Sequence, residues 1–153
     1  MNIYLLAAKA PNRGFSDWSD AVRRTRAGQP YRDSWRVRSG QIDHGDEVYL
    51  LKQGDPPKGI VAHGKIVRES YRHFQNRDGS GATSFRVDVE FDLVLGPADE
   101  PVPWPLPNQG YPGKFRGPFA SGVLLAAELV PALERLWTKR VSTLQKTEVW
   151  LTP

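Results

Sequence analysis

The stretch GDEVYLLKQGDPPKGIVAHGKIV, from Gly45 to Val67, decides the fold, because it predicts two strands joined by a tight turn. The runs on both sides of the turn are largely apolar, as in strands that are buried on two faces. The residues between them, GDPP, favour a turn and cannot continue a ladder, so we predict a hairpin-like connection. Gly59 and Gly64 lack a Cβ, which permits a barrel bend, a bulge or the close approach of another backbone or a ligand.

Length and composition set the outer limits of the interpretation. A chain of 153 residues with 39% hydrophobic content predicts a single domain over residues 1–153 with one sizeable core. The absence of cysteine excludes disulfides and thiolate chemistry, and three scattered histidines argue against a zinc site. The first residues carry no basic segment before an apolar one, and no apolar run is long enough to span a membrane. We therefore expect a soluble cytoplasmic protein without a membrane partner.

The remaining elements follow from periodicity and turn residues. We predict a first strand over Asn2 to Ala8 and a half-exposed strand over Thr83 to Leu95. Helices are expected at about Asp17 to Ala27, capped by Ser16, and at Leu124 to Lys139. The expected irregular parts are a short irregular run that can add a short strand (Tyr31 to Val37), an exposed loop (Tyr71 to Ala82), a proline-rich wrapping loop (Gly96 to Pro118) and a final strand or tail (Val141 to Pro153). The order favours an α+β fold, a mixed and mostly antiparallel small barrel flanked by helices.

Arginine is unevenly distributed along the chain. Arginines outnumber lysines by 14 to 7, and seven of them fall between Arg13 and Arg38. Three aspartates oppose these seven, which leaves a local excess of +4 that equals the net charge of the whole chain. The planar guanidinium matches phosphate oxygens and stacks on bases, so this bias favours a phosphate-bearing partner. A solvated helix face is the alternative explanation.

Motifs of catalysis are missing from the sequence. His44, His63 and His73 have no metal-ligand spacing such as HExxH and no carboxylate partner nearby in sequence, and no serine lies in a GxSxG motif. The glycines near Gly79 and Gly81 do not precede a helix with lysine and a hydroxyl residue, so a phosphate-binding loop is not supported. We therefore expect a noncatalytic binding domain without cofactor or metal.

Aromatic residues alternate with arginines over Trp18 to Phe74 and suggest base binding. Stacking on an aromatic face contributes about 1 to 3 kcal/mol per base, and a base enclosed on both sides must leave the duplex stack. Core packing is the competing explanation for each aromatic residue, above all for Trp18 and Tyr49. Trp35 lies in YRDSWRVRSG between a helix and a strand, where a cage residue is most expected. Asp33 and Ser34 beside it can read polar edges of a base.

The chain resembles a known family in these segments. A first strand, a helix with a tryptophan, a second tryptophan segment, GDEVYLLKQG, a turn and GIVAHGKIV followed by an aromatic loop are similar to the PUA-like superfamily. The closer resemblance is to EVE-type domains and their YTH relatives, especially EVE-like modules at the N-terminus of HNH endonucleases in modification-dependent restriction. It spans Asn2 to Trp137, with its specific part at Trp35 to Val67.

The resemblance implies a noncatalytic reader that flips a modified base into an aromatic cage, with 5-methylcytosine in duplex DNA as the expected ligand. It puts Trp35 in the cage wall, Trp18 and Ser34 at the rim, and Tyr71 or Phe74 opposite, where relatives often have tryptophan and this chain has SYRHFQNR. Cleavage would depend on a nuclease partner or a fused HNH domain. Together, the residues and the resemblance give as base-binding candidates Trp18, Tyr31, Asp33, Ser34, Trp35, Tyr71 and Phe74, and as phosphate-binding candidates Arg13, Arg32, Arg36, Arg38, Lys52 and Arg72.

Two alternatives remain open from the sequence. The first is an RNA-binding PUA-like module, which would prefer single strands and ignore cytosine methylation; YTH relatives bind N6-methyladenine in RNA. The second is a small hydrolase of modified nucleosides, which would need a constellation such as Lys52, Glu69 and Ser70 in one cavity.

Overall fold

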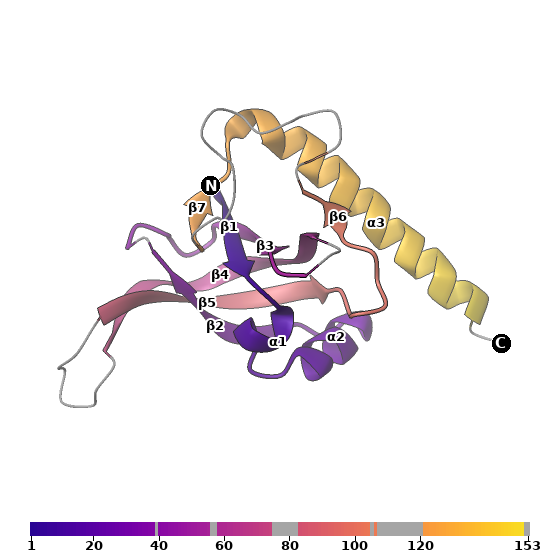
Figure 1. Cartoon of the computed structure of the whole chain (residues 1–153), viewed down its shortest axis with the longest axis horizontal. Helices are drawn as coiled ribbons and strands as arrows, with labels where there is room; N and C mark the ends of the chain where they lie inside the picture. The colour runs from indigo at the N-terminus through magenta and orange to yellow at the C-terminus, as the bar shows by residue number, and fades with distance from the viewer. Residues whose placement is uncertain (39, 56–57, 75–82, 105, 107–120, 152–153) are drawn as a thin grey trace.

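The computed structural model in Figure 1 describes residues 1–38, 40–55, 58–74, 83–104, 106 and 121–151. For Arg13, Phe74, Thr83 and 145–151 only the backbone is described. Within these ranges the chain forms one sheet, with helices packed on it. The α+β class with mostly antiparallel pairing is confirmed.

The sheet consists of seven strands, six of them in the order β2-β5-β4-β3-β1-β7. Most neighbours are antiparallel, while β1 and β3 are parallel. A two-residue strand, β6, pairs with the beginning of β4. The bounds of the strands are β1 Ile3–Ala8, β2 Tyr31–Val37, β3 Glu47–Lys52, β4 Gly59–Phe74, β5 Thr83–Val94, β6 Val102–Pro103 and β7 Val123–Leu124.

The predicted hairpin is present as β3 and β4, which pair from Glu47 opposite Lys65 to Lys52 opposite Gly59. Val48 and Leu50 of β3 are fully buried, as are Ile60 and Ala62 of β4, and Ala62 is opposite Leu50. Gly64 allows close backbone approach, because a Cβ there would lie 2.7 Å from the Glu90 carbonyl oxygen. The pairing of β4 with β5 shifts register at this glycine, so it also marks an irregularity that bends the strand.

The sheet curves but does not close into a barrel, which corrects the sequence-based expectation. Its two ends, β2 and the β1–β7 pair, meet near Ser121. The Arg38 N–H donates to the Ser121 carbonyl at 3.0 Å, and the Ala7 N–H donates to Ser121 Oγ at 3.2 Å. Strand β2 pairs only with β5 in the described structure, so a gap remains between β1 and β2.

In the sequence, the first two helices follow β1 and precede β2. Helix α1, Pro11–Gly14, is a single turn, and α2, Trp18–Arg26, follows it. The cap of α2 is Asp17, whose side chain accepts from the Asp20 N–H, and not Ser16 as predicted. Thr25 fixes the end of α2 on the sheet, because its buried hydroxyl accepts the Val94 N–H at 3.0 Å.

Two irregular segments of the sequence-based prediction are regular in the structure. Tyr31 to Val37 is strand β2 throughout, with Tyr31, Trp35 and Val37 buried. Tyr71 to Phe74 continues β4, and the rest of the expected loop lies outside the described residues. Most of Gly96 to Pro118 also lies outside them.

The C-terminal helix is longer than predicted. Leu124 belongs to β7, a 3-10 turn covers Ala127–Leu129, and α3 runs over Val130–Leu151. The described part of the expected final strand or tail is therefore helical. Pro131 begins the helix and does not kink it, since the first turn needs no N–H donor there. Buried Leu133 and Trp137 join α3 to the core. In the part of the chain that the structure describes, no helix is long and apolar enough to cross a membrane.

Candidate functional site

A pocket of about 700 Å³ occupies the gap between β1 and β2. Its volume is within the range of small-molecule sites. The end of β1, the end of α1, β2, the beginning of β5 and Ser121 contribute to it. Its described lining consists of Ala7, Ala8, Lys9, Gly14, Ser34, Trp35, Arg36, Val37, Arg38, Ser84, Phe85, Arg86 and Ser121.

The charge of this lining is one-sided. Lys9, Arg36, Arg38 and Arg86 line the pocket, and no acidic residue is among the described lining residues. Within the described structure, Lys9, Arg36 and Arg38 form no salt bridge; the acids of the arginine-rich segment are engaged elsewhere. Arg36 and Arg38 are exposed. Four cations without a counter-charge favour an anionic ligand, and the guanidinium groups favour phosphate.

Two aromatic side chains line the pocket in different ways. Trp35 is only 4% exposed and forms edge contacts with Phe15 and Phe91, with ring centroids 5.1 and 6.1 Å apart. Its indole lies so close under Gly14 that a Cβ there would be 2.2 Å from Cη2. Phe85 is half-buried and therefore more accessible. Trp35 is thus both a core residue and a wall of the pocket.

Polar groups also reach the pocket. Arg86 donates from Nη1 to Ser34 Oγ at 3.1 Å, which holds the guanidinium at the pocket edge. Asp33, predicted to read a base beside Ser34, accepts from the N–H and the hydroxyl of Ser16 at 2.7 and 2.8 Å. Asp33 therefore fixes the entry to α2 and is not a lining residue.

The other aromatic candidates of the N-terminal half pack in the core. Trp18 is half-buried on the inner side of α2, and its indole N–H donates to the Leu95 carbonyl at 3.0 Å. Tyr31 is buried, and its hydroxyl accepts the Asp17 N–H at 3.2 Å. Burial and the nearby charge of Asp33 raise the pKa of Tyr31. Neither residue lines the pocket, so core packing explains both.

Tyr71 lies outside the pocket lining as well. Its hydroxyl donates to Asp88 at 2.9 Å, and the Arg68 guanidinium lies 3.8 Å from the centroid of its ring. Arg32 approaches the same carboxylate at 3.5 Å. Burial and the hydrogen bond to Asp88 raise the pKa of Tyr71. These groups form a network on β2, β4 and β5, so in this structure the Tyr71 side chain is engaged outside the pocket.

The remaining predicted residues are scattered. Arg72 lies over the Phe85 ring, 5.9 Å from its centroid, and so borders the pocket without lining it. Lys52 ends β3 beside Ala8 in the parallel register but does not line the pocket. The side chains of Arg13 and Phe74 lie outside what the structure describes.

The hydrolase constellation is not assembled. Lys52 pairs with Gly59 at the beginning of the 16-residue β4, whereas Glu69 and Ser70 lie in its second half. Ser70 is engaged with Ile42, whose N–H donates to the serine hydroxyl at 3.1 Å. Lys52 at the end of β3 therefore lies beside the beginning of β4, away from Glu69 and Ser70.

A second pocket, of about 510 Å³, lies between the sheet and α3 and contains a histidine–carboxylate pair that sequence reasoning missed. His63 Nδ1 lies 2.8 Å from Asp92 Oδ1, and Nε2 lies 3.6 Å from Glu47 Oε2. Burial lowers the pKa of His63, but its hydrogen bond to Asp92 and the charges of Asp92 and Glu47 outweigh this and raise it. Among the described residues no serine or threonine bonds to the imidazole, and no group of three or more candidate metal ligands occurs.

The residues that sequence reasoning missed at the first pocket are Lys9, Phe85 and Arg86. Lys9 is an isolated lysine at the end of a predicted strand, and Phe85 and Arg86 are neighbours in the alternating run that predicts a half-exposed strand over Thr83 to Leu95. Only the register of β5 on β2, in which Arg86 is opposite Arg36, brings it to the pocket.

Comparison with known proteins supports the fold and leaves the activity open. No protein-family model matches the chain, and neither does any curated protein sequence. The crystal structure of protein PSPTO5229 from Pseudomonas syringae is similar, with a TM-score of 0.59 and 20% identity over 88% of this chain and 98% of that one. A hypothetical protein from Leishmania major matches 62% of this chain and 69% of its own, with 21% identity and a TM-score of 0.43.

Proposed function

We propose that this protein is a noncatalytic reader of a modified base in DNA, with 5-methylcytosine as the ligand and the β1–β2 pocket as the site that receives the flipped base. The observation that supports this most directly is the composition of the lining. Trp35 and Phe85 offer aromatic surface, while Lys9, Arg36, Arg38 and Arg86 supply positive charge with no acid among the described lining residues. A planar ligand attached to phosphates fits both features.

The arrangement also suits a base that has left its helix. The pocket lies in a gap between two strands, beside exposed Arg36 and Arg38, so a flipped nucleotide can enter while its neighbouring phosphates stay at the surface. Flipping costs a few kcal/mol, and one stacking contact of about 1 to 3 kcal/mol together with phosphate contacts offsets it. The PUA-like and EVE-type resemblance of Trp35 to Val67 supports the same function. A nuclease partner or fused HNH domain would supply cleavage.

The preference for a methyl group has a physical limit. Burying one methyl contributes about 0.8 kcal/mol, or about fourfold in affinity. A larger preference requires that the unmodified base leave a gap or an unpaired group in the pocket. We therefore expect a preference of at least fourfold for 5-methylcytosine over cytosine in otherwise identical duplexes.

The test is a titration of matched duplexes, with cytosine or 5-methylcytosine at one position, at a fixed salt concentration. Phe85→Leu and Trp35→Phe each keep a large apolar side chain and probe the walls, whereas Trp35→Ala would remove most of a core side chain. Both variants should reduce the methyl preference. Arg36→Gln with Arg38→Gln should weaken both duplexes equally and lower the dependence of affinity on salt by about two units.

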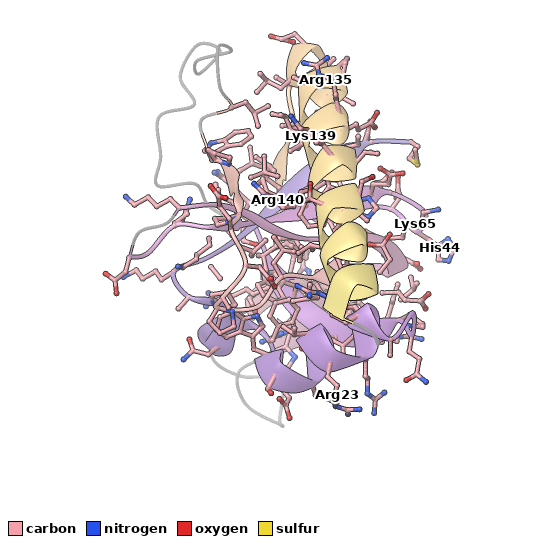
Figure 2. The ribbon with its side chains drawn as sticks, turned by 90° about the vertical axis from the view of Figure 1, so that its right-hand side faces the viewer. Arg23, His44, Lys65, Arg135, Lys139 and Arg140 are labelled. Carbon is pink, nitrogen blue, oxygen red and sulfur yellow. The ribbon has the colours of Figure 1, made fainter. Side chains whose placement is uncertain are left out.

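The control is Arg135→Gln, which removes an exposed arginine of α3, labelled in Figure 2, that does not line the pocket. It should leave both affinities unchanged. Equal binding of the two duplexes by the wild type would overturn the assignment of 5-methylcytosine. A wild type that binds single-stranded RNA more tightly than either duplex would favour the RNA-binding alternative.

A further inference from the structure

The two longest strands extend past the rest of the sheet as a two-stranded arm (Figure 1). We define the arm as 71–74 of β4 and 83–86 of β5, which pair from Tyr71 opposite Arg86 to Phe74 opposite Thr83. The pairing of β2 with β5 ends at Phe85. The pairing of β3 with β4 ends at Lys65. On the β4 side the arm therefore has no further strand within the described structure, whereas on the β5 side Phe85 and Arg86 still pair with β2 and only Thr83 and Ser84 lie beyond it.

The charge of the arm is positive. Its eight residues, YRHF and TSFR, include two arginines and a histidine and no acid. Arg72 and His73 are exposed. Arg68, just before the arm, is exposed and stacks on the Tyr71 ring at 3.8 Å. A narrow two-stranded ribbon with exposed arginines has the dimensions of elements that enter the major groove of B-form DNA.

The arm and the pocket share residues. Ser84, Phe85 and Arg86 line the pocket and also form the β5 half of the arm. Arg72 lies over the Phe85 ring, 5.9 Å from its centroid. A nucleic acid whose base occupies the pocket must therefore continue next to the arm. The three residue steps from Tyr71 to Phe74 span about 10 Å at roughly 3.3 Å per residue, which corresponds to about three base pairs.

We infer that the β4–β5 arm lies in the major groove of duplex DNA on one side of the modified base, and that Arg68 and Arg72 contact phosphates there. This inference rests on the proposed function, because it assumes that the base enters the β1–β2 pocket. The inference implies that the base bound in the pocket belongs to a B-form DNA duplex. The deep, narrow major groove of an RNA duplex does not admit such a ribbon.

The experiment combines truncated duplexes with an arm variant. Four DNAs carry the same 5-methylcytosine: a full duplex, a duplex cut close to the base on its 5′ side, one cut on its 3′ side, and the single strand. The proteins are the wild type, Arg68→Gln with Arg72→Gln, and the control Arg135→Gln. An RNA duplex of the same sequence completes the set.

We expect one of the two truncations to weaken wild-type binding about tenfold and the other to have little effect. In the arm variant this difference disappears, and the slope of log affinity against log salt for the full duplex falls by about two units. Arg135→Gln behaves as the wild type. Unfolding curves of the three proteins verify that the arm variant is folded.

The inference is overturned if the wild type tolerates both truncations, if the arm variant is as sensitive as the wild type, or if the single strand or the RNA duplex binds as well as the full DNA duplex. The preference for 5-methylcytosine over cytosine is read separately. If the wild type shows no preference for 5-methylcytosine but is still sensitive to one truncation, the proposed function is contradicted and the arm remains a DNA contact. If the wild type prefers 5-methylcytosine but tolerates both truncations, only the inference about the arm is contradicted.

Discussion

Replacing Gly14 by alanine should displace the Trp35 ring, because the two are in direct contact. A Cβ on Gly14 would lie 2.2 Å from Cη2 and 2.4 Å from Cζ2 of Trp35, whereas ordinary contact begins at 3.4 Å. The indole or the α1 turn must therefore move by about 1.2 Å. Phe15 and Phe91 pack against the ring, so it cannot move freely within the core. The pocket is the space on its open side.

The change in the free energy of unfolding that we expect for Gly14→Ala follows from two opposing effects. Overpacking of this kind costs about 1 to 3 kcal/mol, and alanine is favoured over glycine in a helix by up to about 1 kcal/mol. Gly14 does not have a positive φ, so no backbone strain is added. We expect the free energy of unfolding to fall by about 1 to 2 kcal/mol, and the preference for 5-methylcytosine to fall with it as the ring enters the pocket.

The assay is urea unfolding of Gly14→Ala beside Gly96→Ala, followed by the duplex titration. Gly96 is also half-buried and without a positive φ, but a Cβ there would meet its nearest atom at 3.4 Å. Gly96→Ala should therefore stay within about 0.5 kcal/mol of the wild type. Equal stability of the two variants would refute the contact between Gly14 and Trp35, and with it the position of the pocket wall.

Three further predictions concern other parts of the structure. Thr25→Val should lower the free energy of unfolding by about 1 to 3 kcal/mol in urea titrations, because it leaves the buried Val94 N–H without its acceptor, whereas Thr25→Ser should keep most of the stability. The pKa of His63 is raised above its usual 6.5, so the protonated imidazole stabilises the fold fully below about pH 6.5, and this contribution is lost as the pH rises through the raised pKa. His63→Gln should remove that part of the decrease in stability between pH 6 and 8.5, and an unchanged pH profile would refute the interaction with Asp92. Phe85→Leu should weaken binding of the modified duplex by about 1 to 3 kcal/mol in titrations if Phe85 stacks on the base, with little change in the unfolding midpoint.

The strands around the turn could be predicted from sequence because their apolar runs and turn residues act locally. The apolar runs within Gly45 to Val67 predict β3 and the first half of β4. The alternation of apolar and polar residues likewise predicts β5. The second half of β4 could not be predicted in this way. Its residues are polar, and their strand conformation depends on pairing with β5, which is a tertiary contact.

The candidate site was predictable only in part for a similar reason. Ser34, Trp35, Arg36 and Arg38 are neighbours in sequence, so one segment suggested all four, although Trp35 proved to be a buried strand residue. Lys9, Phe85, Arg86 and Ser121 come from three other segments and reach the pocket through sheet register and the meeting of the sheet ends. Amino-acid composition contains no signal for such contacts between segments that are distant in sequence.

The most direct test of the proposed base flipping is a fluorescence measurement. A duplex keeps the 5-methylcytosine paired with guanine and carries 2-aminopurine, paired with thymine, as the neighbouring base, and its emission is followed as the wild-type protein is added to saturation. We predict a rise in emission, because extrusion of the modified base into the β1–β2 pocket leaves the neighbouring 2-aminopurine poorly stacked, and no comparable rise with the unmodified duplex at equal occupancy. Unchanged emission from a saturated modified duplex would contradict flipping and the proposed use of the pocket.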